Sequence, residues 1–136
     1  MENCIFCKII NNEINSIKVY EDVNFIAIED ITPTNKGHTL IIPKKHSENI
    51  LEMDSETSSE LTKIIKKIGK SIIKGLGAKG FNTIINTGKE AGQEVFHTHI
   101  HIIPRFENDK IEFPKGKETT KEELILTAEK IIKNLD

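Results

Sequence analysis

Residues 95–103 read VFHTHIHII, and this short stretch holds three of the five histidines in a chain of 136 residues. Side chains alternate between the two faces of a β-strand, so the stretch predicts a strand with His97, His99 and His101 on one face. Along an extended strand the outer two would lie about 13 Å apart, whereas zinc binds each nitrogen at about 2.0–2.1 Å. The row therefore favours a reaction site over a single metal site or an incidental cluster of surface histidines.

The neighbouring segments predict how this strand begins and ends. Residues 81–87 alternate as a second strand, residues 88–93 form a connecting loop, and Pro104 is expected to end the histidine-bearing strand. Gly88 and Gly92 allow the backbone of the loop to approach an anion closely. Such a loop is commonly no more than a hairpin turn, but this one leads directly into the histidines.

The rest of the chain predicts an α+β fold. Alternating apolar residues indicate three earlier strands, and helical spacing indicates a helix at each end and one in the centre. The strands are expected at residues 17–21, 25–29 and 39–42 and the helices at residues 4–11, 54–76 and 120–135, with Gly75, Gly77 and Gly80 ending the central helix. Because strands flank one long central helix, we expect an antiparallel sheet of about five strands, with a short N-terminal helix and a C-terminal helix.

Length and charge limit the classes of partner. A chain of 136 residues suits a single domain. Its 19 Lys and Arg residues against 21 Asp and Glu residues give a formal net charge of −2, so we expect no broad attraction to nucleic acid or to an anionic membrane. No apolar stretch approaches the roughly 20 residues that cross a bilayer, and the first residues lack a secretory profile. We therefore expect a cytoplasmic protein.

Cys4 and Cys7 form a C-x-x-C pair, which is typical of a redox pair, a disulfide or half of a zinc site. A thioredoxin-like pair normally follows a strand, and only three residues precede this one. A disulfide is unusual in a cytosolic protein. Two thiolates in the first turn of a helix supply two zinc ligands, so the sequence favours zinc.

The histidine stretch resembles the signature of the histidine triad (HIT) family of nucleotide hydrolases and transferases, in which histidines alternate with apolar residues, and Thr98 is its one polar departure. Other blocks resemble the family in the same order, namely residues 30–33 (DITP), 37–46 (GHTLIIPKKH), 86–88 (NTG) and 91–96 (AGQEVF). The resemblance covers about residues 4–105. It implies a HIT-like fold, with residues 1–136 forming a single HIT domain whose C-terminal extension and helix occupy about residues 106–136.

The resemblance implies that His99 is the nucleophile that attacks the α-phosphorus of a nucleotide conjugate, forming a nucleotidyl-histidine that water then cleaves. A neutral imidazole is nucleophilic near neutral pH, and its other nitrogen must donate to a fixed acceptor such as a backbone carbonyl. His101 would contact the phosphate or the departing group. His38 would belong to the same histidine network, in a supporting or a catalytic role.

The resemblance also implies a nucleotide pocket. Asp30 would accept both ribose hydroxyls, and Asn86, Gly92 and Gln93 would contact the α-phosphate. Glu94 stands where some relatives carry a serine that touches the departing group. Candidates for an apolar wall around the base, each also compatible with the ordinary core, are Phe6, Ile9, Phe25 and Ile28.

In the branch of the family that this N-terminus resembles, two histidines complete a Cys₂His₂ zinc site. The matching positions in this chain are His46 and His97. Four protein ligands would make the zinc structural, and it would hold the N-terminal helix beside the triad. The resemblance further implies a homodimer whose sheets join across a two-fold axis, with the C-terminal segment near the partner's site.

Together these residues predict an enzyme that hydrolyses purine nucleoside phosphoramidates, such as adenosine phosphoramidate. One alternative is a regulatory or interaction module that binds purine nucleotides. Another is a hydrolase of dinucleoside polyphosphates. All three need the same pocket, so the sequence does not separate them.

Overall fold

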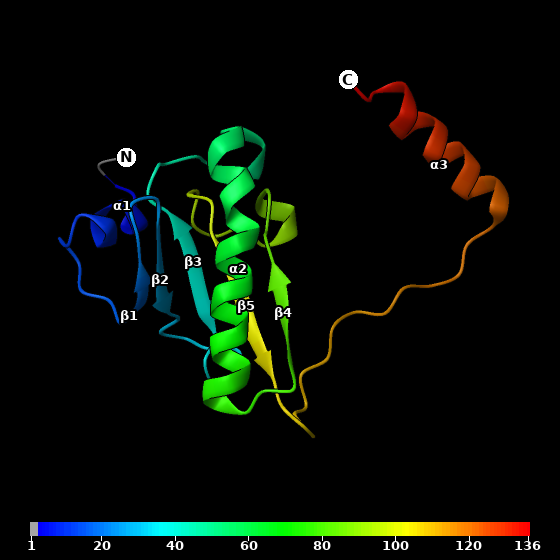
Figure 1. The fold of residues 1–136 in the computed structure, drawn as a ribbon. Helices are drawn as coiled ribbons and strands as arrows, with labels where there is room; N and C mark the ends of the chain where they lie inside the picture. Colours follow the sequence, from blue (N-terminus) through cyan, green and yellow to red (C-terminus); the bar gives the residue numbers. More distant parts are fainter. Residues whose placement is uncertain (1–2) are drawn as a thin grey trace.

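The computed structural model describes residues 3–136 (Figure 1). In chain order the elements are α1 (Ile5–Ile10), β1 (Lys18–Glu21), β2 (Phe25–Glu29), β3 (Thr39–Pro43), the 3-10 turn η1 (Ile50–Glu52), α2 (Ser55–Leu76), β4 (Gly80–Ile84), the 3-10 turn η2 (Lys89–Ala91), β5 (Ile100–Arg105) and α3 (Lys121–Lys133). Within the described residues, five strands pair antiparallel in the order β1-β2-β3-β5-β4. The predicted α+β fold, with an antiparallel sheet and a long central helix, is confirmed.

The alternation along β2 separates two packing layers. Phe25 and Ala27 belong to the core between the sheet and α2, the helix that lies in front of one face of the sheet in Figure 1. Ile26 and Ile28 belong to a second core, which α1 covers. Because successive side chains of a strand point to opposite faces, the sheet has one face under each helix.

β5 presents its histidine to the α1 face. Ile100 and Ile102 pack in the core under α2, so His101 between them points to the opposite side. For the part of the stretch that is a strand, the predicted division into a packing face and a polar face is therefore confirmed.

The predicted boundaries of this strand were wrong at both ends. β5 begins at Ile100, not at residue 95, so His97 and His99 lie in an irregular segment. The backbone N–H of Thr98 donates to the carbonyl oxygen of Ser47 at 2.8 Å, which draws this segment away from the sheet ladder. The preceding strand is also shorter than predicted, since β4 ends at Ile84.

Pro104 does not end β5, which continues to Arg105 and pairs with β4 there. Pairing with β3 ends at Ile102. Beyond that point β5 has a neighbouring strand on one side only, where a residue without an N–H is tolerated.

The bounds of α2 follow from its caps. The carboxylate of Asp54 accepts a hydrogen bond from the backbone N–H of Thr57 at 2.8 Å, as an N-cap residue does. Gly77 ends the helix with a φ of 72°, a left-handed conformation that favours glycine. Gly75 was expected to help end the helix, but it lies inside the last turn.

The C-terminal helix forms where the sequence predicts it, with Thr120 as the N-cap of α3. Figure 1 shows α3 standing away from the sheet at the end of an extended segment. None of its residues is buried, and the exposed apolar side chains include Leu124, Ile125, Ile131 and Ile132.

Among the described residues, no helix is both long enough and apolar enough to span a bilayer.

Candidate functional site

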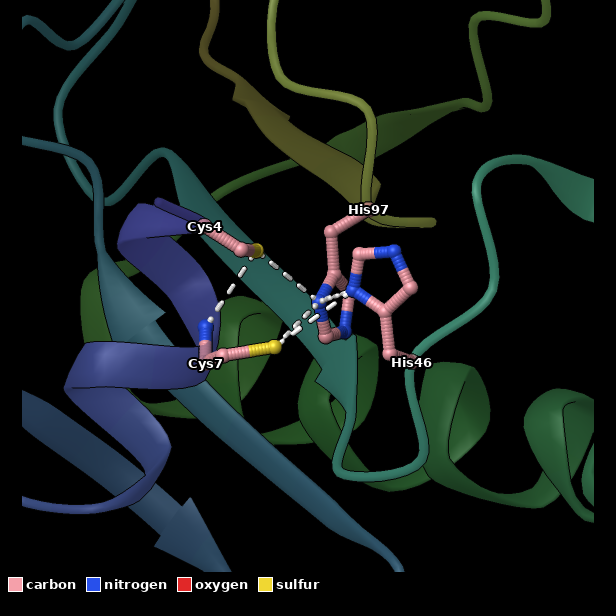
Figure 2. Close-up of side chains that lie close together, drawn as sticks. All are labelled: Cys4, Cys7, His46 and His97. Atoms are coloured by element: carbon pink, nitrogen blue, oxygen red, sulfur yellow. Dashed lines mark hydrogen bonds between the residues drawn. The ribbon is translucent and has the colours of Figure 1, made fainter. Parts of the chain in front are cut away.

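Four possible metal ligands meet where α1 approaches the segment before β5 (Figure 2). The Sγ atom of Cys4 lies 3.4 Å from Nδ1 of His97, and the Sγ atom of Cys7 lies 3.4 Å from Nδ1 of His46. The two Nδ1 atoms are 3.1 Å apart. The ligand atoms of all four residues lie within 4.8 Å of one another, so the predicted set comes together although His46 and His97 belong to distant segments.

The hydrogen bonds around His97 show which of its nitrogens is available to a metal. Nε2 lies 2.8 Å from the carbonyl oxygen of Pro43, which can only accept, so Nε2 carries the proton. Nδ1 is then unprotonated and directs its lone pair toward the cysteines. A ring nitrogen fixed by a carbonyl in this way is the usual arrangement behind a metal-ligating histidine.

The donor set suits zinc. Two sulfurs and two imidazole nitrogens form the Cys₂His₂ set of structural zinc sites. Burial, followed by the neighbouring Cys4, raises the pKa of the Cys7 thiol to about 11. Without a cation this thiol therefore keeps its proton at neutral pH, and metal binding has to displace that proton.

A cavity of about 460 Å³ opens on the α1 face of the sheet, beside the metal-ligand cluster. Its volume is in the range of small-molecule sites. Apolar residues from α1 and β2 form part of its lining, including Phe6, Ile9 and Ile28. His38, His99 and His101 also line it, which places three of the five histidines at one cavity.

His99 is held in one tautomer. Its Nδ1 lies 2.7 Å from the backbone carbonyl oxygen of His97, and a carbonyl can only accept, so Nδ1 carries the proton. Nε2 is left with a free lone pair. The Phe6 ring packs edge-on against His99, with the two ring centroids 4.9 Å apart.

His38 and His101 form a directed hydrogen-bonded pair. The backbone N–H of Thr34 donates to Nδ1 of His38 at 3.0 Å, so the proton of the neutral His38 ring sits on Nε2. This N–H points to Nδ1 of His101, 2.9 Å away. His101 therefore carries its own proton on Nε2, where it can donate to a ligand.

The same bonds argue against a second metal site. Asp30, His38 and His101 offer ligand atoms within 4.8 Å of one another. However, Nε2 of the neutral His38 ring carries a proton, because Nδ1 accepts from the Thr34 amide. Metal binding there would need an imidazolate, so this group is better described as a hydrogen-bond network.

Burial keeps the cavity histidines neutral. It is the main cause that lowers the pKa of both His38 and His99, with Asp30 opposing the shift. The pKa of His101 is lowered to about 4, by burial first and then by His99 and His38. All three rings are therefore neutral at pH 7.

Asp30, Asn86 and Gly92, which the resemblance assigns to nucleotide contacts, all line the cavity. One carboxylate oxygen of Asp30 accepts from the backbone N–H of Thr32 at 2.8 Å, and the other lies 3.5 Å from Nε2 of His38. Gly92 has a φ of 94° and lies against the Asn86 amide. A side chain at residue 92 would be strained by this φ, although its Cβ would make only an ordinary contact with that amide.

Two predicted nucleotide contacts do not reach the cavity. Phe25 is fully buried in the core on the opposite face, because its place in the alternation of β2 points it toward α2. Gln93 is buried and used internally, since its amide donates to the carbonyls of Glu48 and Val95 and accepts from the N–H of Gly88. Gln93 therefore holds the loop rather than lining the pocket.

Sequence reasoning missed several groups that shape the cavity. The Thr34 amide fixes the tautomer of His38, and a backbone donor leaves no signal in residue type. Ser47 holds the segment between His97 and His99 through Thr98, with 2.7 Å between the two hydroxyl oxygens. Further lining residues that the sequence did not single out for the pocket are Ile5, Ile14, Asn15, Ser16, Glu29, Ile31, Thr32, Leu40 and Val95.

Comparison with known proteins defines the class. A HIT domain profile matches residues 11–108, and the chain belongs to this family. It is 50% identical over 118 residues to a HIT-like protein of Borreliella burgdorferi, covering 85% of each chain. An adenosine 5′-monophosphoramidase of Schizosaccharomyces pombe is 40% identical, over 76% of this chain and 74% of that one. An adenylylsulfatase of Arabidopsis thaliana is 43% identical, over 79% of this chain but only 54% of that one.

Solved structures agree with the fold. A protein of Streptococcus mutans superposes with a TM-score of 0.94 at 41% identity, covering 100% of this chain and 87% of that one. A zinc-bound histidine triad protein of Mycobacterium smegmatis superposes with a TM-score of 0.79 at 35% identity, covering 98% and 99%.

Proposed function

We propose that this protein hydrolyses nucleoside 5′-monophosphate conjugates, in particular purine nucleoside phosphoramidates, through a covalent intermediate on His99. The observation that carries the proposal is the tautomer of His99. Its Nδ1 proton is held by the His97 carbonyl at 2.7 Å, which leaves Nε2 as a neutral nucleophile inside the cavity. The monophosphoramidase among the relatives supports the same chemistry.

The other cavity groups have roles that fit this reaction. His101 presents an N–H to the phosphate or to the departing atom, and His38 acts as a positioning residue that keeps His101 in that tautomer. Asp30 accepts the ribose hydroxyls, while Asn86 and the backbone at Gly92 meet the α-phosphate. The apolar side chains of Phe6, Ile9 and Ile28 enclose the purine base.

The reaction then runs in two displacements. The lone pair of His99 Nε2 forms a bond to phosphorus as the bond from phosphorus to the departing atom breaks. The departing atom keeps that electron pair and takes a proton from solvent, while the Nε2–H of the neutral His101 ring donates a hydrogen bond to it. Water next attacks phosphorus, the electron pair of the P–N bond returns to His99, and the proton released by water returns to solvent.

We propose zinc as the ion held by Cys4, Cys7, His46 and His97. Four protein ligands leave no open coordination position, so the role of zinc would be structural. It would tie α1 to the segment before His99, and with it the part of the cavity wall that α1 supplies. We also propose a cytoplasmic setting, where both thiols stay reduced and available to the metal.

We propose a homodimer in which α3 packs on the second copy. The helix has 13 residues, and none of them is buried against the rest of its own chain. Isolated helices of this length are marginal in water. A partner surface that covers the exposed Leu and Ile residues would stabilise the helix.

The test compares wild type with His99→Asn. Asparagine keeps an N–H that can reach the His97 carbonyl but has no nucleophilic nitrogen. We expect turnover of adenosine 5′-phosphoramidate to fall by about 10³-fold or more, while binding of AMP, measured by calorimetry, changes little. Mass spectrometry of the quenched wild type should find an adenylyl group on the peptide that contains His99. Full activity in the variant would refute the mechanism, and AMP binding by a wild type without turnover would favour a binding module.

A further inference from the structure

The cavity is acidic. Among the described residues that line it, Glu29, Asp30 and Glu94 are carboxylates, and neither Lys nor Arg contributes a side chain. Burial lowers the pKa values of His38 and His101, so these two rings add no positive charge at neutral pH. Every charged side chain in this described lining is therefore a carboxylate, and a bound phosphate there is met by hydrogen-bond donors.

Asp30 and Glu94 lie toward opposite ends of the strands. β2 and β4 run in opposite directions within the antiparallel order, so the residues that follow β2 and those that follow β4 lie at opposite ends of the sheet's strands. Asp30 follows β2, while Asn86, Gly92 and Glu94 belong to the loop after β4. With the ribose at Asp30, as the proposed function has it, the group beyond the α-phosphate lies toward Glu94.

Glu94 is suited to meet a ligand. Its neighbours in sequence point inward, with Gln93 buried and Val95 packed against the core under α1, whereas Glu94 is exposed and lines the cavity. No salt bridge within the described residues involves its carboxylate. No ion pair within residues 3–136 therefore compensates its charge.

Building on the proposed function, we propose that Glu94 makes the enzyme selective for conjugates whose departing group is an amine with a further positive charge. The carboxylate would attract such a group and repel departing groups that are anionic, such as a sulfate, a phosphate chain or a carboxylate-bearing amine. The same charge disfavours dinucleoside polyphosphates as substrates. The adenylylsulfatase among the relatives acts on a conjugate of the disfavoured kind.

The bonds change as in the proposed reaction. The P–N bond of the phosphoramidate breaks, its electron pair stays on the amine nitrogen, and a proton from solvent makes the amine neutral while His101 donates a hydrogen bond to it. Glu94 takes no part in bond making or breaking. It is a specificity-determining residue, so its substitution should change the ranking of substrates more than the rate with an uncharged one.

The test uses three adenosine 5′-phosphoramidates that share the same P–N bond and differ in distal charge. Their amines are 1,4-diaminobutane (cationic), butylamine (neutral) and 4-aminobutanoate (anionic). For wild type we expect kcat/KM to fall in that order, with the cationic conjugate about 10-fold or more above the anionic one. Glu94→Gln should bring the three values together, and Glu94→Lys should reverse the order.

A matched control is Glu90→Gln, which removes a carboxylate from the same loop at a residue that does not line the cavity. We expect this variant to keep the wild-type order. An unchanged order in Glu94→Gln, or equal hydrolysis of all three conjugates by wild type, would overturn the inference and leave the proposed function standing. Failure of wild type to hydrolyse any of the three would instead count against the proposed function itself, and the inference would fall with it.

Discussion

The backbone carbonyl oxygen of His97 lies 2.7 Å from Nδ1 of His99, so one residue serves both halves of the site. The ring of His97 faces the two cysteine sulfurs, and its backbone carbonyl fixes the proton on the ring of His99, two residues later. Any shift of His97 that follows from changes at the metal-ligand cluster is therefore passed to the proposed nucleophile through a single residue.

We predict that removing the metal loosens α1 first. The helix has six residues, and Cys7 together with the N-cap residue Cys4 supplies two of the four ligands, so a bound metal would hold the first turn in addition to the packing of Phe6. Hydrogen exchange of residues 5–10 should speed up after chelation, whereas exchange in the middle of α2 should change little. AMP should also bind more weakly, because α1 lines the cavity.

Metal analysis of the purified protein is the control for this experiment, and close to one zinc per chain is expected. Cys7→Ser should reproduce the effect of chelation without a chelator. Unchanged exchange of α1 after verified metal loss would contradict the structural role.

Acid should weaken the fold through His101. Its pKa is about 4 in the folded chain, against about 6.5 for an unperturbed histidine, so the unfolded chain binds more protons between these values. The free energy of unfolding should be at its full value above about pH 6.5 and fall as the pH drops toward 4. Allowing for partial exposure of the ring, we expect His101 to account for about 1–2 kcal/mol. Urea unfolding at pH 7.5 and pH 5 measures the loss, which should be smaller in His101→Asn. Equal losses in the two proteins would rule out this source.

Alanine substitutions at two glycines of α2 should change the free energy of unfolding in opposite directions. A methyl group at Gly69 would overlap the ring of Phe81, whereas one at Gly75 would meet nothing within 4 Å. Gly69→Ala should therefore destabilise the protein by about 1–3 kcal/mol despite its better helix propensity. Gly75→Ala should stabilise it by about 0.5–1 kcal/mol. Thermal or urea unfolding of the two variants checks both signs, and stabilisation by Gly69→Ala would show that the Phe81 ring can move aside.

Ending the chain at residue 114 should weaken the dimer. This truncation removes α3 but keeps Asp109, whose carboxylate binds the Arg105 guanidinium at 2.7 Å and holds the start of the extended segment. Light scattering across a concentration series should show a dimer for the full chain and a shift toward monomer for the shortened one. Ile131→Ser should act in the same direction, with Glu129→Ser as a control on the same helix. A full chain that is monomeric at all concentrations would contradict the proposed assembly.

The sequence by itself determined the elements and the family. Periodicity and capping report local patterns, such as the alternation along β2 and the capping residues of α2 and α3. The order of the motif blocks indicated the family. These patterns also indicated the residues of the metal-ligand cluster and about half of the residues that line the cavity.

Only the tertiary structure decided how these residues are used. Phe25 and Ile26 are neighbouring apolar residues, and the pleat of β2 points their side chains to opposite faces of the sheet. Only the residues that pack against them show which face lies under α2 and which lies on the side of the cavity. The proton positions on His38 and His99 depend on backbone groups of Thr34 and His97, which no residue type reveals. Long-range packing and backbone hydrogen bonding are not encoded in a linear pattern. They place His97 among the possible metal ligands and His99 and His101 at the cavity.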